Sequence, residues 1–224
     1  MANLPDGFRP NVVSGHFDHE PGMSEDILDT DRQSERRTRI LDAAIAVAGA
    51  GGYELVHMRD IAEHAGVSLG TLYQYFPSKV HVLVRALERE LLRFDDYLSQ
   101  NMSDITDPFI RLRVVVWRLI TAMEQSDRMT EALTHAYVAS NVVASPEAEA
   151  IRDQTSEMFA YYMSDGVVAG LERHAADLLT DVWTAEILAL VQGRRTYTEM
   201  RHTLNKAVDL VARSALGGNG IQIR

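Results

Sequence analysis

The chain has 224 residues, 46% of them hydrophobic, so it can bury a sizeable core and is not wholly disordered. It contains no cysteine, which excludes disulfides, thiolate nucleophiles and cysteine metal sites. The net charge of −10 hides an uneven distribution, because the region 32–93 holds nine basic and seven acidic residues while both flanking regions are net acidic. Binding to nucleic acid requires local positive charge, so the acidic total does not exclude it.

The N-terminal region differs in composition from the rest of the chain. Residues 1–33 are acidic, rich in proline and glycine and without helical periodicity, so we expect a mostly disordered extension. His16 and His19 stand beside Asp18, but two histidines and an aspartate without further ligands are usually solvated, so we expect neither a metal nor a cofactor. No apolar run approaches the roughly 20 residues that span a bilayer. Because the N-terminus does not resemble a signal peptide either, we expect a cytoplasmic protein with no membrane partner.

From Ser34 onward, apolar residues recur at three- and four-residue spacing, which predicts an all-α fold. Gly51 and Gly52 end the first helix. Two short helices and a long one that begins at Pro77-Ser78 follow, and residues 217–224 are expected to form a flexible tail. The remaining helices are expected at about 108–125, 128–143, 146–165, 173–193 and 197–216.

The segment from Met58 to Phe76 meets the requirements of a helix-turn-helix. Ala62 provides the small residue at the helix crossing, and Gly66, four positions later, tolerates a positive φ. Ser68 is a suitable N-cap for the second helix. The apolar residues that would hold the two helices together are Ile61, Val67, Leu72 and Phe76.

The second helix of this motif is short and polar on one side, as a helix that reads the major groove should be. Gln74 is the best candidate for a base contact, because its amide can form two hydrogen bonds with adenine. Lys79 begins the next helix, where free backbone N–H groups also favour a phosphate. The alternatives are a solvated face for the arginines at 36–39 and a core position for Tyr73. The predicted DNA-binding residues are Arg36, Arg39, Arg59, Ser68, Leu69, Gly70, Thr71, Tyr73, Gln74, Tyr75 and Lys79.

The helices between 108 and 216 carry many methionines and polar-tipped aromatic residues, which favour a cavity for a large apolar ligand with one polar end. For each such residue the alternative is an ordinary core position. Arg194 and Arg195 either meet an anionic ligand group or balance a helix dipole. The last two helices have more apolar surface than one inward stripe needs, which predicts a homodimer. The predicted ligand-binding residues are Trp117, Met123, Leu133, Tyr137, Met158, Phe159, Tyr162 and Trp183.

The run from Gly51 to Lys79 strongly resembles the N-terminal domain of the TetR family, and the resemblance covers about residues 34–97. It implies a helix-turn-helix domain over 34–80 and a helical regulatory and dimerisation domain over 81–216. Further segments resemble the KstR-type members, which repress sterol catabolism in actinobacteria and are released from DNA by CoA thioesters of sterol side-chain intermediates. This chain has Gln74 where that group favours arginine, so the operator sequence does not follow from the resemblance. The further segments are 77–90, 107–112, 130–138 and 181–183.

We therefore expect a repressor that binds palindromic double-stranded operator DNA as a homodimer and is released by a hydrophobic effector, an acyl-CoA or a sterol-derived CoA thioester. The alternative is a sensor of hydrophobic drugs or cations that controls efflux genes. That alternative predicts cavity-facing carboxylates from Glu124, Glu131 or Glu157. An enzyme is disfavoured, because Glu199 and His202 match only half of a di-iron helical motif.

Overall fold

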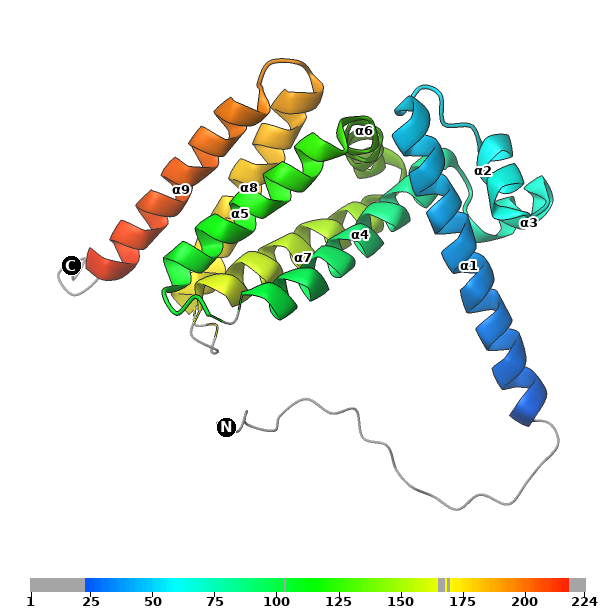
Figure 1. The fold of residues 1–224 in the computed structure, drawn as a ribbon, viewed down its shortest axis with the longest axis horizontal. Helices are drawn as coiled ribbons and strands as arrows, with labels where there is room; N and C mark the ends of the chain where they lie inside the picture. The colour runs from blue at the N-terminus through cyan, green and yellow to red at the C-terminus, as the bar shows by residue number, and fades with distance from the viewer. Residues whose placement is uncertain (1–22, 103, 165–167, 169, 218–224) are drawn as a thin grey trace. The chain divides into compact units, whose positions relative to one another are not determined.

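Figure 1 shows the fold in a computed structural model, which describes residues 23–102, 104–164, 168 and 170–217. All of the regular structure in those ranges is helical, which confirms the predicted all-α fold. None of the described helices is long and apolar enough to cross a membrane. The helices are α1 (Met23–Gly51), α2 (Met58–Ala65), α3 (Leu69–Tyr75), α4 (Lys79–Asn101), α5 (Pro108–Gln125), α6 (Asp127–Val143), α7 (Ser145–Met163), α8 (Gly170–Val191) and α9 (Tyr197–Gly217).

The chain divides into two compact units, residues 1–35 and residues 36–224. Helix α1 begins at Met23 rather than at Ser34, where the periodicity predicted its start. Residues 1–22 of the predicted extension and residues 218–224 of the predicted tail lie outside the described residues. The packing described below belongs to the second unit.

The second half of α1 contributes one buried face to the core. Ile40, Ala44 and Ala48 are each 0% exposed and repeat every four residues, so they form one stripe along the helix. The helix is closed by Gly52, which has a φ of 72° and donates its N–H to the Ala48 carbonyl at 2.8 Å. A Cβ at Gly52 would lie only 2.5 Å from a carboxylate oxygen of Glu131. This position therefore requires glycine for its backbone angle and for the space around it.

Helices α2 and α3 form the turn that the sequence predicted. Gly66 adopts the left-handed conformation with a φ of 64°, and the Val67 N–H bonds to the Ala62 carbonyl at 3.0 Å. Ser68 caps α3 by accepting the backbone N–H of Thr71 at 3.0 Å. Val67 is partly buried against the core, and the other residues predicted to hold the two helices together are buried: Ile61, Leu72 and Phe76.

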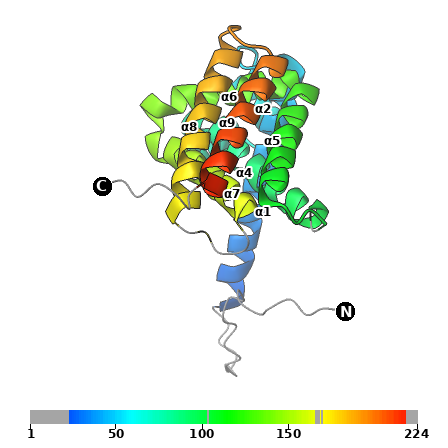
Figure 2. The same ribbon diagram turned by 90° about the vertical axis from the view of Figure 1, so that its left-hand side faces the viewer.

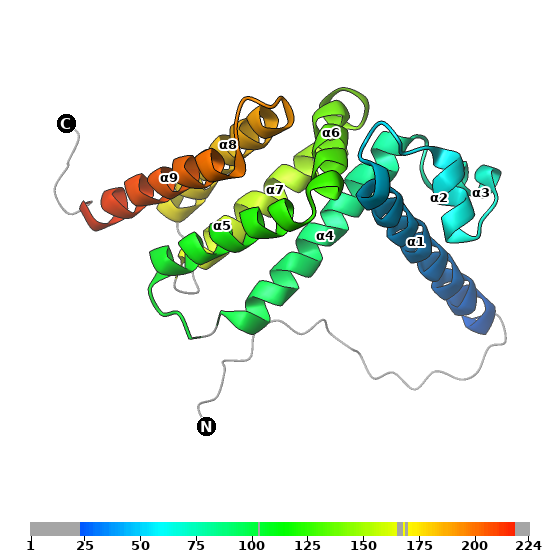
Figure 3. The ribbon, with the colours of Figure 1, turned by 45° about the horizontal axis from the view of Figure 1, so that its top comes forward.

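Helix α4 follows α3, the second helix of the helix-turn-helix, and packs against α6 and α7. Helix α5 packs against α7 and α9, and α8 packs against α7 and α9. Figures 2 and 3 show α8 and α9 running side by side next to α5. Arg111 of α5 fixes the end of α7 by donating to the backbone carbonyls of Tyr162 and Ser164. The second unit is thus a helical bundle in which α4 connects the helix-turn-helix to the remaining helices.

Two glycines of the helix-turn-helix should respond oppositely to alanine. Gly66→Ala should lower the free energy of unfolding by roughly 1–2 kcal/mol, because alanine resists the left-handed conformation. Gly70→Ala should raise it by about 0.5–1 kcal/mol, because Gly70 lies in α3 and a Cβ there would meet only the Ser68 hydroxyl, at 3.8 Å. Urea unfolding of both variants measures the difference. Equal effects at the two positions would contradict the left-handed turn.

Candidate functional site

Helix α3 presents a polar face to solvent and anchors itself on the opposite side through Leu72, which is 0% exposed. Gln74 is exposed and Tyr73 is 49% exposed, so both side chains are available to a partner. The Ser68 hydroxyl also lies 2.8 Å from the Thr71 hydroxyl. These two residues therefore shape the start of α3, and their hydroxyls are already engaged with each other.

The eleven predicted DNA-binding residues occupy α1, α2, the α2–α3 turn, α3 and the first residue of α4. None of them is fully buried, and the half-buried ones are Arg36, Thr71, Tyr75 and Lys79. Figures 1 and 3 show α2 and α3 beside the same end of α4. All eleven residues are therefore accessible in the structure, and their contact with DNA stays a prediction.

Lys79 has an intramolecular role that the sequence did not reveal. Its ammonium group lies 4.0 Å from the centroid of the Tyr53 ring and donates to the Tyr53 backbone carbonyl at 3.2 Å. The start of α4 is thereby fastened to the loop between α1 and α2. A phosphate contact by Lys79 would have to share the ammonium with these two acceptors.

Helix α6 holds the same loop from the other side. The Glu131 carboxylate accepts the Tyr53 backbone N–H at 2.8 Å, and the His135 ring stacks on the Tyr53 ring at 5.4 Å. Arg128 donates to the Ala50 carbonyl at 2.6 Å, where a positive charge suits the C-terminal end of α1. One face of α6 is therefore attached to the helix-turn-helix region.

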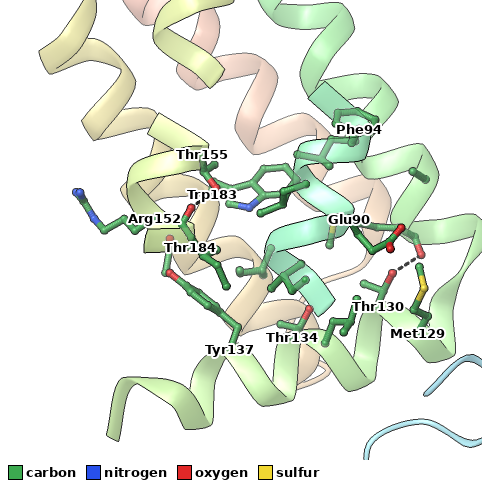
Figure 4. Close-up of a pocket in the computed structure, with 18 of the residues that line it drawn as sticks. Glu90, Phe94, Met129, Thr130, Thr134, Tyr137, Arg152, Thr155, Trp183 and Thr184 are labelled. Atoms are coloured by element: carbon green, nitrogen blue, oxygen red, sulfur yellow. Dashed lines mark hydrogen bonds between the residues drawn. The ribbon is translucent and has the colours of Figure 1, made fainter. Parts of the chain in front are cut away.

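The opposite face of α6 helps to line a cavity of about 310 Å³, a size at the lower end of ligand pockets. Helices α4, α5, α7 and α8 supply the remaining walls, and most lining side chains are apolar. Figure 4 shows the cavity with the Trp183 indole in the middle of the lining residues. The lining residues are Leu87, Glu90, Leu91, Arg93, Phe94, Leu119, Ala122, Met123, Met129, Thr130, Leu133, Thr134, Tyr137, Ile151, Arg152, Thr155, Thr180, Trp183, Thr184 and Ile187.

Half of the predicted ligand-binding set lines this cavity, namely Met123, Leu133, Tyr137 and Trp183. The other half does not line it. Trp117 is 52% exposed on the outside of α5, whereas Phe159 is fully buried behind the cavity wall with its ring edge-to-face against Trp183 at 6.1 Å. Met158 lines a second cavity between α4 and α7, and Tyr162 is buried with its hydroxyl directed to the Asp95 carbonyl.

The predicted ligand-binding set contains no residue of α4, although that helix lines the cavity. Its lining residues Leu87, Leu91 and Phe94 recur at three- and four-residue spacing, a pattern that fits a core stripe equally well. The threonines of the cavity were missed as well. A threonine on an apolar helix carries no sequence signal that distinguishes a cavity from solid core.

Three of those threonines donate hydrogen bonds from their hydroxyl groups to backbone carbonyls. Thr130 donates to the Met123 carbonyl at 2.9 Å, and Thr155 donates to the Ile151 carbonyl at 2.8 Å. Thr180 does the same within α8. Because their hydroxyls are satisfied, these residues add little polarity to the cavity. Its polar chemistry is therefore concentrated at a few other side chains.

The polar groups lie on two sides of Trp183, as Figure 4 shows. On one side, burial raises the pKa of the Tyr137 phenol, which hydrogen-bonds the Thr184 side chain, so Tyr137 stays a neutral donor. Arg152 lies on the same side, half-exposed and paired with Asp181 at 2.7 Å. Glu90 lies on the other side and is the one acidic residue among the described residues that line the cavity.

The carboxylates that a cation sensor would need are placed elsewhere. Glu124 pairs with Arg201 at 3.0 Å, Glu131 binds the α1–α2 loop, and Glu157 is exposed beside the second cavity. Arg194 and Arg195, for which the sequence left open an anionic ligand or a helix dipole as partner, each contact a neighbouring side chain. Arg195 lies 3.7 Å from the Glu186 carboxylate, and Arg194 donates to the Gln192 side chain at 2.7 Å. Neither Arg194 nor Arg195 lines the cavity.

Helices α8 and α9 use part of their apolar surface inside the bundle. Ile187, Leu204 and Val208 are buried, so these three belong to the core of the chain itself. Leu178 of α8 is 65% exposed and Val182, one turn further, is half-buried. An apolar strip on α8 therefore remains at the surface after the chain has folded.

Comparison with known proteins agrees with this division of the chain. Residues 40–86 match the family of bacterial regulatory proteins described as the tetR family, and residues 106–211 match a tetracyclin repressor-like C-terminal domain. The transcriptional repressor KstR of Mycobacterium tuberculosis is 41% identical over 84% of this chain and 86% of its own length. KstR of Mycolicibacterium smegmatis is 42% identical over 84% of this chain and 93% of its own.

Solved structures share the fold at lower identity. A TetR regulator from Rhodococcus sp. RHA1 has a TM-score of 0.71 at 24% identity and covers 80% of this chain and 97% of its own. FadR of Thermus thermophilus, solved with lauroyl-CoA, has a TM-score of 0.60 at 17% identity, covering 84% and 97%. FadR of Bacillus subtilis, solved with stearoyl-CoA, has a TM-score of 0.55 at 18% identity, covering 78% and 96%. With its helix-turn-helix and its TetR-type C-terminal domain, the chain belongs to the TetR family and is a DNA-binding transcriptional regulator, not an enzyme.

Proposed function

We propose that this chain is a repressor that leaves its operator when a large apolar effector with an anionic end, such as a sterol-derived CoA thioester, fills the cavity. The observation that carries the proposal is the cavity itself. It is apolar along most of its wall, its neutral donor and half-exposed guanidinium lie on one side of Trp183, and Glu90 lies on the other. The KstR relatives, named as repressors, support the repressor role. We further propose 34–80 as the DNA-binding domain and 81–216 as the regulatory and dimerisation domain.

The effector would lie with its apolar body along Trp183 and Leu133 and with its thioester group toward Tyr137. A neutral phenol donor suits a thioester carbonyl, and a half-exposed guanidinium such as that of Arg152 suits the phosphates of CoA. The FadR structures with lauroyl-CoA and stearoyl-CoA show that other proteins of this fold hold acyl-CoA ligands. The effector class is thus inferred from the polarity of the cavity and from these neighbours.

A sensor of hydrophobic cations is the second candidate, and Glu90 is the one observation in its favour. Its carboxylate oxygen, however, already accepts hydrogen bonds from Arg93 at 2.9 Å and from Arg89 at 3.2 Å. A carboxylate between two guanidinium groups is a poor counter-charge for a third cation. The thioester proposal therefore remains preferred.

The effector would act through α4, because this helix lines the cavity and also follows α3 with only a short turn between them. In a dimer bound to a palindromic operator, the two reading helices lie about 34–36 Å apart, one turn of DNA. A shift of α4 changes that spacing. The effector can lower operator affinity only to the extent that it prefers the altered spacing.

Gln74→Ala tests base reading by α3. We expect it to relax the base preference at one position of each half-site, at a cost of about 1–3 kcal/mol for the preferred base. Fluorescence anisotropy with a panel of operators substituted at single positions measures this preference. Exposed Glu63 of α2 provides the control, because Glu63→Gln should alter all operators alike. A uniform loss across the panel in Gln74→Ala would contradict a base contact.

Arg152→Gln tests the anionic end of the effector. The measurement uses a Trp117→Phe background, in which Trp183 is the one remaining tryptophan. The CoA thioester of cholestenoic acid should quench the fluorescence of Trp183 and should release operator DNA. Arg152→Gln should weaken thioester binding about tenfold, roughly 1.4 kcal/mol, because the phosphates lose a guanidinium. Binding of the uncharged methyl ester of the same acid should change less than twofold.

Arg113→Gln is the matched control, because Arg113 is also half-exposed and paired with an aspartate, Asp209, away from the cavity. It should leave both affinities unchanged. If tetraphenylphosphonium quenches Trp183 and releases DNA while the thioester does neither, the cation sensor replaces the thioester proposal.

We also propose that the chain dimerises through α8 and α9. Leu178→Glu should place a charge in that interface and shift the protein toward monomer in sedimentation experiments, with loss of operator binding. Val142 of α6 is even more exposed, at 87%, so Val142→Glu provides the control and should remain dimeric. A dimeric Leu178→Glu variant would place the interface elsewhere.

A further inference from the structure

Glu90 is the acidic residue of α4 that lines the cavity. Its Oε1 accepts one hydrogen bond from Arg93 Nη1 at 2.9 Å and a second from Arg89 Nη2 at 3.2 Å. The same carboxylate belongs to a residue that lines the cavity, as Figure 4 shows from the cavity side. Glu90 therefore lines the cavity and orients two arginines, of which Arg93 also lines the cavity.

Both arginines reach onward to α1. Arg89 Nη2 lies 2.9 Å from Asp42 Oδ1, and Arg93 Nη2 lies 3.5 Å from the same oxygen. Arg89 also donates from Nη1 to the Thr38 backbone carbonyl at 3.2 Å. The two guanidinium groups are thus shared between a carboxylate at the cavity and a carboxylate on α1. We call Glu90, Arg89, Arg93 and Asp42 the α1–α4 clamp.

The inner members of the clamp are shielded from water. The Arg89 side chain is 16% exposed and that of Glu90 is 28% exposed, against 53% for Asp42. The Arg89 Nε is buried without a hydrogen-bond acceptor. A charge that has lost most of its hydration depends on its remaining partners. A change at Glu90 therefore alters how Arg89 engages α1.

The position of the clamp along α1 connects it to DNA reading. Thr38 and Asp42 lie on either side of the stripe residue Ile40, close to Arg39 of the predicted DNA-binding set. On α4, the clamp lies within about four turns of Lys79, which follows the predicted DNA-reading helix α3. The clamp thus fixes α1 against α4, the two helices that flank α2 and α3 in the chain.

We propose that the α1–α4 clamp reports the content of the cavity to the DNA-binding region, with Glu90 and Asp42 as positioning residues for operator binding. The proposal rests on the proposed function in one respect, that the cavity holds the effector. An effector beside Glu90 displaces its carboxylate from Arg89 and Arg93, and the hold of these arginines on Asp42 and Thr38 changes. Helix α1 is then free to tilt against α4, which spreads the spacing of the two reading helices and weakens operator binding.

The test is a double-mutant cycle that requires no effector. Glu90→Gln and Asp42→Asn should each lower operator affinity by roughly threefold to tenfold in fluorescence anisotropy. The double variant should bind within twofold of the weaker single variant, because both substitutions break the same connection. Unchanged affinity in Glu90→Gln, or losses that multiply in the double variant, would overturn the proposal.

Glu88→Gln is the matched control. Glu88 lies on the same helix, has 29% of its side chain exposed and pairs with Arg85 at 2.8 Å, but it neither lines the cavity nor is paired with α1. This variant should keep operator affinity within twofold, and its effect should multiply with that of Asp42→Asn. Asp42→Glu, which keeps the charge, should restore most of the affinity that Asp42→Asn loses. Failure of that rescue would speak against an ionic clamp.

A second measurement separates this proposal from the proposed function. With the cholestenoic acid thioester, the ratio of operator affinities without and with effector should fall toward one in Asp42→Asn, although Asp42 does not line the cavity. By linkage, operator DNA should then change thioester affinity by the same reduced factor. Equal release of wild type and Asp42→Asn would overturn the clamp and leave the effector proposal standing. A thioester that fails to bind would contradict the effector proposal, while the effector-free cycle still decides the clamp.

Discussion

Helix α4 serves two parts of the molecule at once, and most of the architecture follows from that constraint. Its first residue, Lys79, is fastened to the Tyr53 ring and carbonyl, while Leu87, Leu91 and Phe94 form a wall of the cavity. A rigid helix cannot move at one end without moving at the other, because its backbone hydrogen bonds are continuous. Any ligand that displaces the cavity wall is therefore coupled to the reading helix.

Helix α6 completes this arrangement from the other side of the cavity. Thr134 and Leu133 line the cavity. Glu131 binds the backbone of the α1–α2 loop, and Arg128 binds the backbone of the last turn of α1. Hydrogen bonds from charged side chains to backbone groups are stronger than neutral ones and depend on position. Helix α6 is thus attached to the DNA-binding region by hydrogen bonds from charged side chains, in addition to apolar packing in the core.

The cavity remains open inside the helical bundle although the threonine hydroxyl groups in its wall are hydrogen-bonded. Thr130, Thr155 and Thr180 return their hydroxyls to backbone carbonyls, so their methyl groups remain for contact with an apolar molecule. Tyr137 and Arg152 keep polar capacity and lie together beside Trp183, on the side away from Glu90. This segregation, rather than the size of the cavity, favours a ligand with one anionic end.

The sequence by itself determined the helices and the helix-turn-helix, because these depend on local periodicity, on the Ser68 cap and on the positive φ of Gly66. It identified Tyr137 and Trp183 as cavity residues but also selected Trp117, which is exposed, because an aromatic residue on an apolar helix fits the core, a cavity and an interface equally well. Only the tertiary structure decided these choices and joined Glu90 to Asp42 through two arginines. Such contacts depend on how α1 and α4 cross, and helical periodicity carries no information about the crossing of two helices.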